Sequence, residues 1–424
     1  MSRRASPAGS RRPGALRLPR SLRVLRHRDF ALVQIGNGVS QLGTWGQYVA
    51  LGWGIRQLSS WPFAVALSLV AQFLPSLVLA PFGGTIADRF DRRTIVVAGS
   101  LFAAVPAVGL GLLVASGAQT IPLMLALAAI GGISTAFTQP AMSAVVAQIV
   151  PTGELAEAVA GTSVVQNLTR IAGPSLGAIV ISAWGLQWAF YLNAVSFLAV
   201  VAAWALVRPI ARKFSAHEPL LEQTRLGLQF ARRDAQVRLL LVTTFVTTFV
   251  VYHAALLPVI ATDVLHGHSS DYALLQSATG VGAILGAVVA GEFVTDHRRR
   301  FAIVVALAGI AGTYAVVAES TSIVSTAIAL AGWGFSYFTL SAVIQGLLIA
   351  VPPDEFRGRV MGLYAMVTAG GVPIAALIGG TLGSVVGPGE AVGVAAVVVL
   401  VFLAWFVTTH QERVIRFDAA SRSV

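Results

Sequence analysis

The chain has 424 residues, of which 56% are hydrophobic and 11% are charged, and its mean hydropathy is +0.78. A soluble domain carries roughly twice this share of charged residues, so the composition indicates a membrane protein. The absence of cysteine excludes disulfides and thiolate chemistry, and the net charge of +11 lies in loops and tails without an aromatic-basic module, which argues against nucleic-acid binding.

Long apolar stretches fill the sequence between a basic tail at residues 1–28 and a second tail at residues 410–424. A membrane-spanning helix needs about 20 mostly apolar residues. The sequence therefore predicts an all-α membrane protein with twelve transmembrane helices, at residues 30–56, 62–86, 94–115, 120–149, 155–183, 186–207, 237–261, 272–294, 301–318, 322–351, 358–386 and 389–409. The first six form an N-terminal bundle within residues 29–208, and the last six form a C-terminal bundle within residues 237–409.

Basic residues are concentrated in alternate connections. All but two of the 29 lie in the tails or in every second loop, whereas the intervening loops carry acidic residues, namely Asp263, Asp271, Glu319 and Glu390. Positive residues mark the cytoplasmic side of a membrane protein. The pattern predicts a multi-pass protein of the bacterial inner membrane with both termini in the cytoplasm. The two exceptions are Arg56, at the outer end of the first helix, and Arg170, inside the fifth.

The connection at residues 209–236 separates the two bundles. Its apolar and basic residues are interleaved: Leu221, Leu228 and Val237 with Arg225, Arg232 and Arg233. This pattern is typical of an amphipathic helix lying along the inner leaflet. A plain linker explains the segment equally well.

The two bundles resemble each other in sequence. Asp88 and Asp296, each followed by arginines, are 208 residues apart, and Pro174 and Pro373 are 199 residues apart. Similar offsets near half the chain length indicate a parallel repeat of six helices. Transporters built in this way hold their substrate between the two halves.

Several motifs resemble those of a known family. Gly84-x-x-x-Asp88-Arg89-x-x-Arg92-Arg93 resembles the loop 2–3 signature of the major facilitator superfamily, and Gly173-Pro174-Ser175-Leu176-Gly177-Ala178 resembles its antiporter motif, with Ala178 where a second glycine is usual. Further segments are similar to the bacterial multidrug and enterobactin-exporter-like group of transmembrane secretion effectors: Ser40-Gln41-Leu42-Gly43-Thr44-Trp45, Gln139-Pro140-Ala141, Pro151-x-x-Glu154-Leu155-x-x-Ala158 and Arg357-Gly358-Arg359-Val360-Met361-Gly362. The resemblance covers residues 22–408. It implies two six-helix bundles related by a pseudo-twofold repeat and a rocking exporter, usually driven by protons.

The resemblance gives the first motif a gating role. In the family fold Asp88 reaches the start of the eleventh helix, near residues 357–361, where unpaired amides and the helix dipole favour an anion. This contact would close the cytoplasmic side. Gly84 would allow close helix approach, and Arg92 and Arg93 could hold carboxylates or phospholipid headgroups. Alternatively Arg89, Arg92 and Arg93 serve only to set topology.

Arg170 is the one formal charge near the middle of the bilayer. A central arginine costs at least about 2.5–3.5 kcal/mol, so it must face a partner or water. Asn167 lies on the same side of the helix by its 3.6-residue period. Arg170 either contacts a polar or anionic substrate, or donates hydrogen bonds to neighbouring carbonyls and holds the N-terminal bundle together.

The first helix carries a polar and aromatic stripe. Its members lie within about 80° of one another on the helix: Gln34, Asn37, Gln41, Trp45 and Tyr48. Trp333 and Tyr337 form a smaller stripe on the tenth helix. Amides that faced lipid would lack partners, so these faces must point inward. They predict a substrate cavity for bulky, amphipathic molecules, with hydrogen bonding between helices as the alternative.

Proton coupling has few candidates. A proton carrier needs a carboxylate or a histidine in a cavity that water reaches. The candidates are His253, Glu292 and Asp296, although aromatic packing explains His253 at least as well. Many relatives have an acidic residue near the position of Thr44. This chain has no acidic residue there.

We expect a secondary-active exporter of drug-like, siderophore or secondary-metabolite molecules, and a small-solute importer of the same fold is the alternative. No metal cluster, catalytic triad or ATP-binding loop appears in the sequence, so we expect no enzyme activity, no cofactor and no metal site. The expected partners are a small-molecule substrate, protons and membrane lipids, with no nucleic acid, and the protein is expected to be a monomer.

Overall fold

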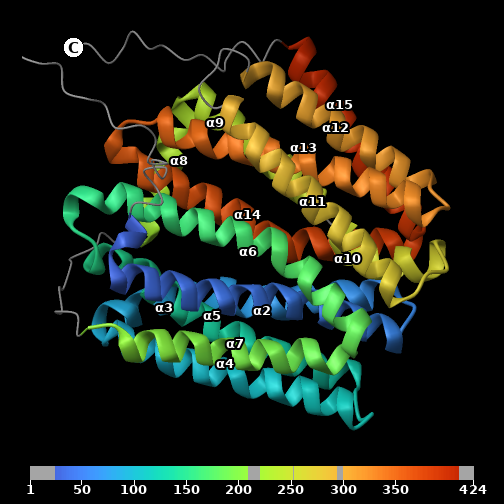
Figure 1. The fold of residues 1–424 in the computed structure, drawn as a ribbon. Coiled ribbons are helices and arrows are strands. Elements are labelled where there is room, and N and C mark those ends of the chain that lie inside the picture. Colours follow the sequence, from blue (N-terminus) through green and yellow to red (C-terminus); the bar gives the residue numbers. More distant parts are fainter. Residues whose placement is uncertain (1–23, 209–219, 252, 294–298, 410–424) are drawn as a thin grey trace, which may run out of the picture.

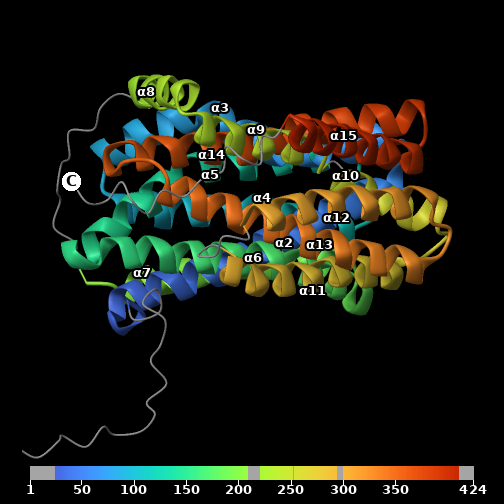
Figure 2. The ribbon, with the colours of Figure 1, turned by 90° about the horizontal axis from the view of Figure 1, so that it is seen from above.

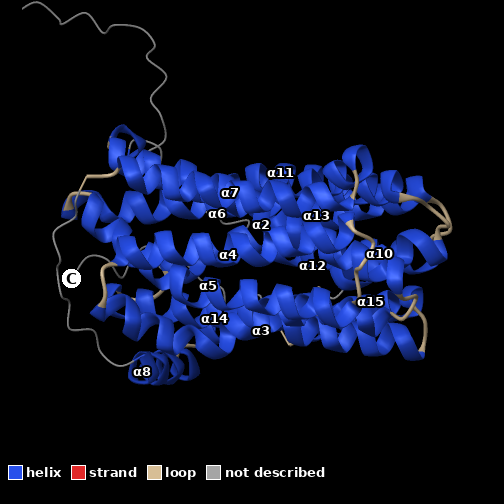
Figure 3. Ribbon diagram, turned by 90° about the horizontal axis from the view of Figure 1, so that it is seen from below, coloured by secondary structure: helices blue, strands red, loops and turns tan. Residues whose placement is uncertain are grey.

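The computed structural model describes residues 24–208, 220–251, 253–293 and 299–409. Within these ranges the chain is helical, with short connections and no strand (Figure 3). The two predicted tails, apart from residues 24–28, lie outside the described residues, as do Asp296 and the side chains of Asp88 and Glu292. The predicted all-α membrane fold is confirmed.

The first half of the chain contains six long helices. A short 3-10 turn, η1 (Val24–Arg26), precedes the first helix, and a second 3-10 turn, η2 (Thr152–Glu154), lies between the fourth and fifth helices. These helices are α2 (Arg28–Leu58), α3 (Pro62–Arg89), α4 (Arg92–Ala115), α5 (Ile121–Ile149), α6 (Leu155–Trp184) and α7 (Leu186–Leu206). In the second half they are α9 (Ala235–Phe249), α10 (His253–Val259), the π-helix η3 (Ile260–Val264), α11 (Ser269–Phe293), α12 (Arg299–Glu319), α13 (Ile323–Ala350), α14 (Asp354–Val385) and α15 (Pro388–Thr408).

Eleven helical stretches of the described chain are long and apolar enough to cross a membrane. The stretch from Ala235 to Val264 counts as one of them and joins α9, α10 and η3. Helix α2 is long enough at 31 residues but is not among the eleven, because the polar residues of its stripe lower its hydropathy. With α2 the helices match the twelve predicted ranges.

The seventh predicted helix is interrupted, whereas the sequence predicts one continuous span over residues 237–261. Helix α9 ends at Phe249 and α10 begins at His253. The carbonyl of Val250 does not accept the N–H of Ala254, which bonds to Val251 instead, and it accepts the Tyr314 hydroxyl at 2.9 Å. A freed carbonyl is tolerated inside a membrane helix when a neighbouring side chain satisfies it in this way.

An additional helix, α8 (Leu220–Arg233), occupies the connection between the two halves. It is strongly amphipathic and packs on α9 and α14. Phe230 stacks on Phe356 of α14, with ring centroids 4.5 Å apart, and the Cα of Gly227 faces the backbone of Arg359. In Figures 1 and 2, α8 lies at one end of the molecule, beside the start of α14.

The helices pack as two groups. In the first group α2 contacts α6 and α7, α3 contacts α5, and α4 contacts α5 and α7. In the second group α13 contacts α11 and α12, α12 contacts α15, and α9 contacts α14. The groups meet mainly where α3 packs on α14 and α6 packs on α11 (Figure 1).

Candidate functional site

Close packing of α2 against α6 positions the central residues. A Cβ built on Gly177 would lie 2.4 Å from the Cα of Gly46, and one built on Gly173 would lie 2.4 Å from the Cβ of Trp45. Nearer the start of both helices, Gln34 Nε2 donates to Thr162 Oγ1 at 2.6 Å. The two glycines of the predicted span-5 motif therefore bring the helices together in a parallel register, which places Gln41 and Trp45 at the level of Arg170.

Arg170 lies at the middle of α6 and is partly buried. Its Cζ atom is 5.6 Å from the centroid of the Trp45 ring, and its charge acts electrostatically on Tyr337 of α13. Among the described residues it has no hydrogen bond and no ion pair. The carbonyl contacts that a purely structural arginine would make are therefore not observed in this part of the chain. A cation–π contact of about 0.5–2 kcal/mol offsets only part of the cost of a central arginine.

The polar stripe of α2 divides into two kinds of residue. Gln34 is 3% exposed and holds α6 through Thr162, which is a packing role. Asn37, Gln41 and Tyr48 are partly buried, and their polar atoms have no hydrogen-bond partner among the described residues. Free amides and hydroxyls in the middle of a membrane protein require water or a ligand.

Aromatic rings extend this surface on α2 and α3. Trp45 and Tyr48 meet edge to face with centroids 5.2 Å apart, and the Phe73 ring lies 5.0 Å from Tyr48. Asn167, one turn before Arg170 on α6, is also partly buried and has no hydrogen bond to the described residues. Phe73 does not stand out in the sequence, because it is one apolar residue in an apolar helix.

The second group contributes an aromatic column. Tyr337 stacks on Trp333 at 4.8 Å with an interplanar angle of 10°, and His253 lies 4.1 Å from Trp333. Trp333 and His253 are each 4% exposed, whereas Tyr337 is only partly buried. Tyr337 is thus the accessible end of the column, and the predicted cavity residue Trp333 lies behind it.

His253 is enclosed by these rings. Its Nδ1 atom lies 2.8 Å from the Tyr314 hydroxyl, which itself donates to the Val250 carbonyl. This geometry matches the aromatic-packed alternative for His253, whose side chain is almost wholly buried. Of the other predicted proton carriers, Asp296 and the Glu292 side chain lie outside the described residues.

The two helix groups are joined at the end of the molecule that carries the α2–α3 connection. We call it the opposite end, because it lies across the molecule from the end that carries the arginine-rich α3–α4 connection. An ion pair links Arg56 of α2 to Asp263 of η3, and Trp53 stacks on Tyr272 with centroids 4.8 Å apart. The N–H of Phe63 donates to Ser384 Oγ at 3.1 Å. A Cβ built on Gly380 of α14 would lie 2.4 Å from the Cβ of Ala66 of α3.

The other end of the molecule carries the α3–α4 connection, and we call it the basic end. Near the helix centres, a Cβ built on Gly370 would lie 3.4 Å from Leu77. Beyond this point, Cβ positions built on Gly84, Gly358 and Gly362 meet no atom of the described residues within 4 Å. Close glycine contacts between α3 and α14 are thus found between the helix centres and the opposite end, whereas Gly84, Gly358 and Gly362, toward the basic end, have open space beside them among the described residues.

The motif arginines bind backbone carbonyls. Arg92 donates from Nε to Ala87 O at 3.3 Å and from Nη1 to Ala144 O at 3.2 Å, and Arg93 Nη1 lies 3.5 Å from Val207 O. Arg89 is exposed. Gly84 makes no close contact, whereas a Cβ on the neighbouring Gly83 would lie 1.9 Å from Ala136 O. Gly83 is the close-approach glycine in this conformation.

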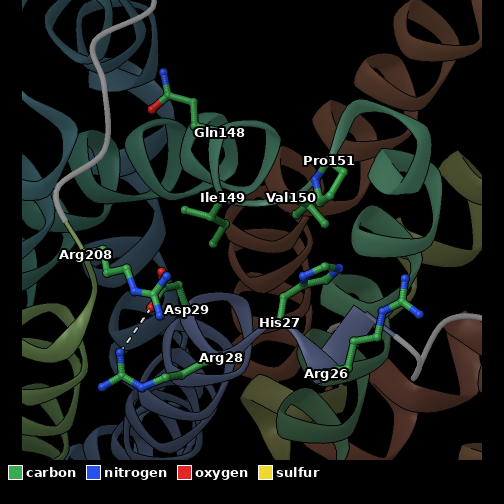
Figure 4. A pocket seen from close by; sticks show the side chains of 9 residues that line it. All are labelled: Arg26, His27, Arg28, Asp29, Gln148, Ile149, Val150, Pro151 and Arg208. Atoms are coloured by element: carbon green, nitrogen blue, oxygen red, sulfur yellow. Dashed lines mark hydrogen bonds and ion pairs between the residues drawn. The ribbon is translucent and has the colours of Figure 1, made fainter.

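A cavity of about 540 Å³ opens at the basic end (Figure 4). It is lined by Arg26, His27, Arg28, Asp29, Gln148, Ile149, Val150, Pro151 and Arg208. Most of its charges are already paired: Arg26 and His27 bind Glu154, and Arg28 binds Asp29 at 3.5 Å. The hydrogen bond from His27, together with Arg26, holds the pKa of Glu154 below its ordinary value. All these residues belong to the first helix group, so the cluster fastens that group rather than lying between the two groups.

Comparisons with known proteins agree with this architecture. Residues 20–423 match the family described as transmembrane secretion effector. An uncharacterized MFS-type transporter of Bacillus subtilis is 26% identical over 81% of this chain and 86% of its own length. Macrolide efflux protein A of Streptococcus pyogenes is 22% identical over 82% and 88%, and the enterobactin exporter of Salmonella choleraesuis is 24% identical over 77% of each chain.

The fold is also similar to solved structures. A bacterial homologue of the human lysosomal transporter Spinster, in an inward-facing and unoccupied conformation, superposes with a TM-score of 0.70 over 93% of this chain and 99% of its own, at 14% identity. The nucleoside transporter NupG superposes with a TM-score of 0.69 over 90% and 99%, at 12% identity. At these identities the likeness concerns the fold alone. The chain belongs to the transmembrane secretion effector family of the major facilitator superfamily, whose members are multi-pass membrane transporters.

Proposed function

We propose that this transporter is a secondary-active exporter of bulky, amphipathic organic molecules, with drugs, siderophores and secondary metabolites as the candidate classes. The observation that carries the proposal is the surface of unbonded polar and aromatic side chains that α2 and α6 present at the middle of the molecule. Asn37, Gln41 and Arg170 lack hydrogen bonds to the described residues, and Trp45 lies among them. Apolar rings with a few convergent polar groups are typical of sites for organic ligands.

The contacts between the groups support alternating access. The two groups are fastened at the opposite end by Arg56–Asp263 and Trp53–Tyr272, and α3 and α14 have free glycines toward the basic end. The arginine distribution favours a cytoplasmic basic end and cytoplasmic termini in the inner membrane. In this orientation the described conformation is inward-facing, and the Asp88 contact of the predicted latch belongs to the other state.

The names of two relatives support export as the direction of transport. A macrolide efflux protein and an enterobactin exporter are similar over more than three quarters of this chain. The likeness to a nucleoside transporter carries no argument for import, because at 12% identity it concerns only the fold. Proton antiport is part of the proposal. Because His253 is sealed by aromatic rings, the stretch containing Glu292 and Asp296 is its leading location.

Transport in membrane vesicles tests this function. Everted vesicles from a pump-deficient strain expressing the protein should accumulate an exported dye or a macrolide when a proton gradient is imposed, and a protonophore should abolish the accumulation. Vesicles carrying Asp88→Asn at equal abundance should accumulate less. Uptake confined to right-side-out vesicles would contradict export, and accumulation that is insensitive to the protonophore would contradict proton antiport.

A further inference from the structure

In the part of the chain that the structure describes, no carboxylate lies at the level of Arg170 in the membrane. The chain has 18 acidic residues, and within the transmembrane helices each of them lies in a first or last turn; the rest lie in connections and tails. The nearest acid on the same helix is Glu157, in the first turn of α6 and 13 residues before Arg170. At 1.5 Å per residue this separation is about 20 Å along the helix axis.

The groups around Arg170 are donors and aromatic faces. On α6, Asn167 lies one turn away, and on α2 the register set by Gly46 and Gly177 brings Gln41 alongside. Trp45 holds the guanidinium over its ring and thereby fixes the direction in which the charge points. Guanidinium and amide N–H groups that converge beside apolar rings form a site for a negatively charged oxygen.

Tyr337 is a residue of the second helix group that interacts electrostatically with Arg170. It is the accessible end of its aromatic column, and it lies within electrostatic range of Arg170. A ligand bound to Arg170 with its apolar body against Tyr337 would contact both groups at once. Binding at this position would therefore be coupled to the movement of the two groups.

We infer that Arg170 is a specificity-determining residue that selects substrates carrying an anionic oxygen, such as a carboxylate or a phenolate, on an aromatic or otherwise apolar body. The inference rests on the proposed function, because it concerns the same site. It narrows the substrate class from amphipathic molecules in general to amphipathic organic anions. Asn167 and Gln41 complete the donor set, and Trp45, Tyr48 and Tyr337 contact the apolar body.

Matched ligands test the inference on the unmodified protein. The probes are 1-pyrenebutyric acid, its methyl ester and the corresponding trimethylammonium compound, which share one aromatic body and differ in charge. Equilibrium binding to the full-length protein in nanodiscs, corrected with empty nanodiscs, should favour the acid over the ester and the cation by about tenfold or more, since a hydrogen bond to a charged group has about this worth. Equal affinities for acid and ester would overturn the inference.

Variants then test whether Arg170 is responsible for the preference for the acid. Arg170→Gln should weaken binding of the acid about 10- to 100-fold and leave the ester within about threefold, whereas Arg170→Lys should keep part of the preference. Arg225→Gln, on the exposed face of α8, is the matched control and should change neither. If Arg170→Gln does not fold, Asn167→Leu and Gln41→Leu provide the same comparison. A preference that survives in Arg170→Gln would also overturn the inference.

Vesicle transport separates this inference from the proposed function. If everted vesicles accumulate the ester and the cation as well as they accumulate the acid, export stands and the selection by Arg170 is wrong. If only right-side-out vesicles take up the acid, while nanodisc binding still depends on Arg170, the site is correct and the direction of transport is wrong.

Discussion

The ion pair between Arg56 and Asp263 makes a prediction about the conformational equilibrium. The two residues are 207 positions apart and join the helix groups at the opposite end. Their side chains are 16% and 35% exposed, so the pair is partly screened by solvent and is worth about 0.5–1 kcal/mol. Arg56→Gln should therefore shift the equilibrium between the closed and open forms of this end by a factor of about two to five.

The natural absence of cysteine makes this shift directly measurable. Spin labels on Ser60→Cys and Ser270→Cys, exposed positions on either side of the opposite end, report the separation of the two groups. Arg56→Gln and Asp263→Asn should each enlarge the long-distance population in pulsed electron paramagnetic resonance. High salt should have the same effect in the unmodified protein and none in the variants, because ions screen an exposed pair.

The double variant decides whether the two side chains act through each other. Arg56→Gln combined with Asp263→Asn should resemble either single variant, since only one interaction can be lost. Arg225→Gln on α8, an exposed arginine with an acidic neighbour in its own helix, should leave the distances unchanged. Distances in Arg56→Gln that equal those of the unmodified protein, or additive effects in the double variant, would refute the assignment of this pair as a latch.

Three further outcomes follow from the described contacts. Gly177→Ala should lower the melting temperature, because overpacking against α2 reduces the free energy of unfolding by about 1–3 kcal/mol. Gly362→Ala adds a methyl group in open space, so it should leave the melting temperature unchanged or raise it slightly. Because the folded-state pKa of Glu154 is depressed, its carboxylate stabilises the protein fully at pH values above the ordinary glutamate pKa of about 4.3. The melting temperature of the unmodified protein should therefore exceed that of Glu154→Gln in this range, and the difference should vanish as the pH falls through the depressed pKa. A difference that persists at still lower pH would contradict this role of Glu154. His253→Gln should retain protonophore-sensitive transport in everted vesicles, and loss of that sensitivity with folding intact would show that His253 carries the proton.

Much of the fold could be predicted from the sequence because apolar length and arginine placement are local signals. The helices begin and end close to the predicted residues for this reason. The interruption of the seventh helix is different. It depends on the Tyr314 hydroxyl, which bonds to the carbonyl of Val250 from another helix 64 residues away. No local pattern in residues 237–261 contains that partner.

The candidate site was predictable in composition but not in detail. The period of the α2 stripe correctly groups its polar residues, but the partner of Gln34 is Thr162 on α6, and only the fold shows that this amide serves packing. Two readings of Arg170 were open in the sequence, and the lack of carbonyl partners among the described residues favours one of them. Gln47 and Asn193 form a buried pair at 2.8 Å that the sequence does not indicate, because each is an isolated amide in its helix.

The positions of the free glycines connect the two proposed latches. Asp88 lies one turn after Gly84, and its predicted partner is the stretch of α14 that contains Gly358. Both glycines face open space in the described conformation, while Gly380, farther along α14, is in close contact with α3. A rigid α14 that tilts about its contact near Gly370 can close one end only by opening the other. The Arg56–Asp263 pair and the Asp88 contact would then exclude each other, and a substrate held between Arg170 and Tyr337 would lie near the level about which the two groups turn.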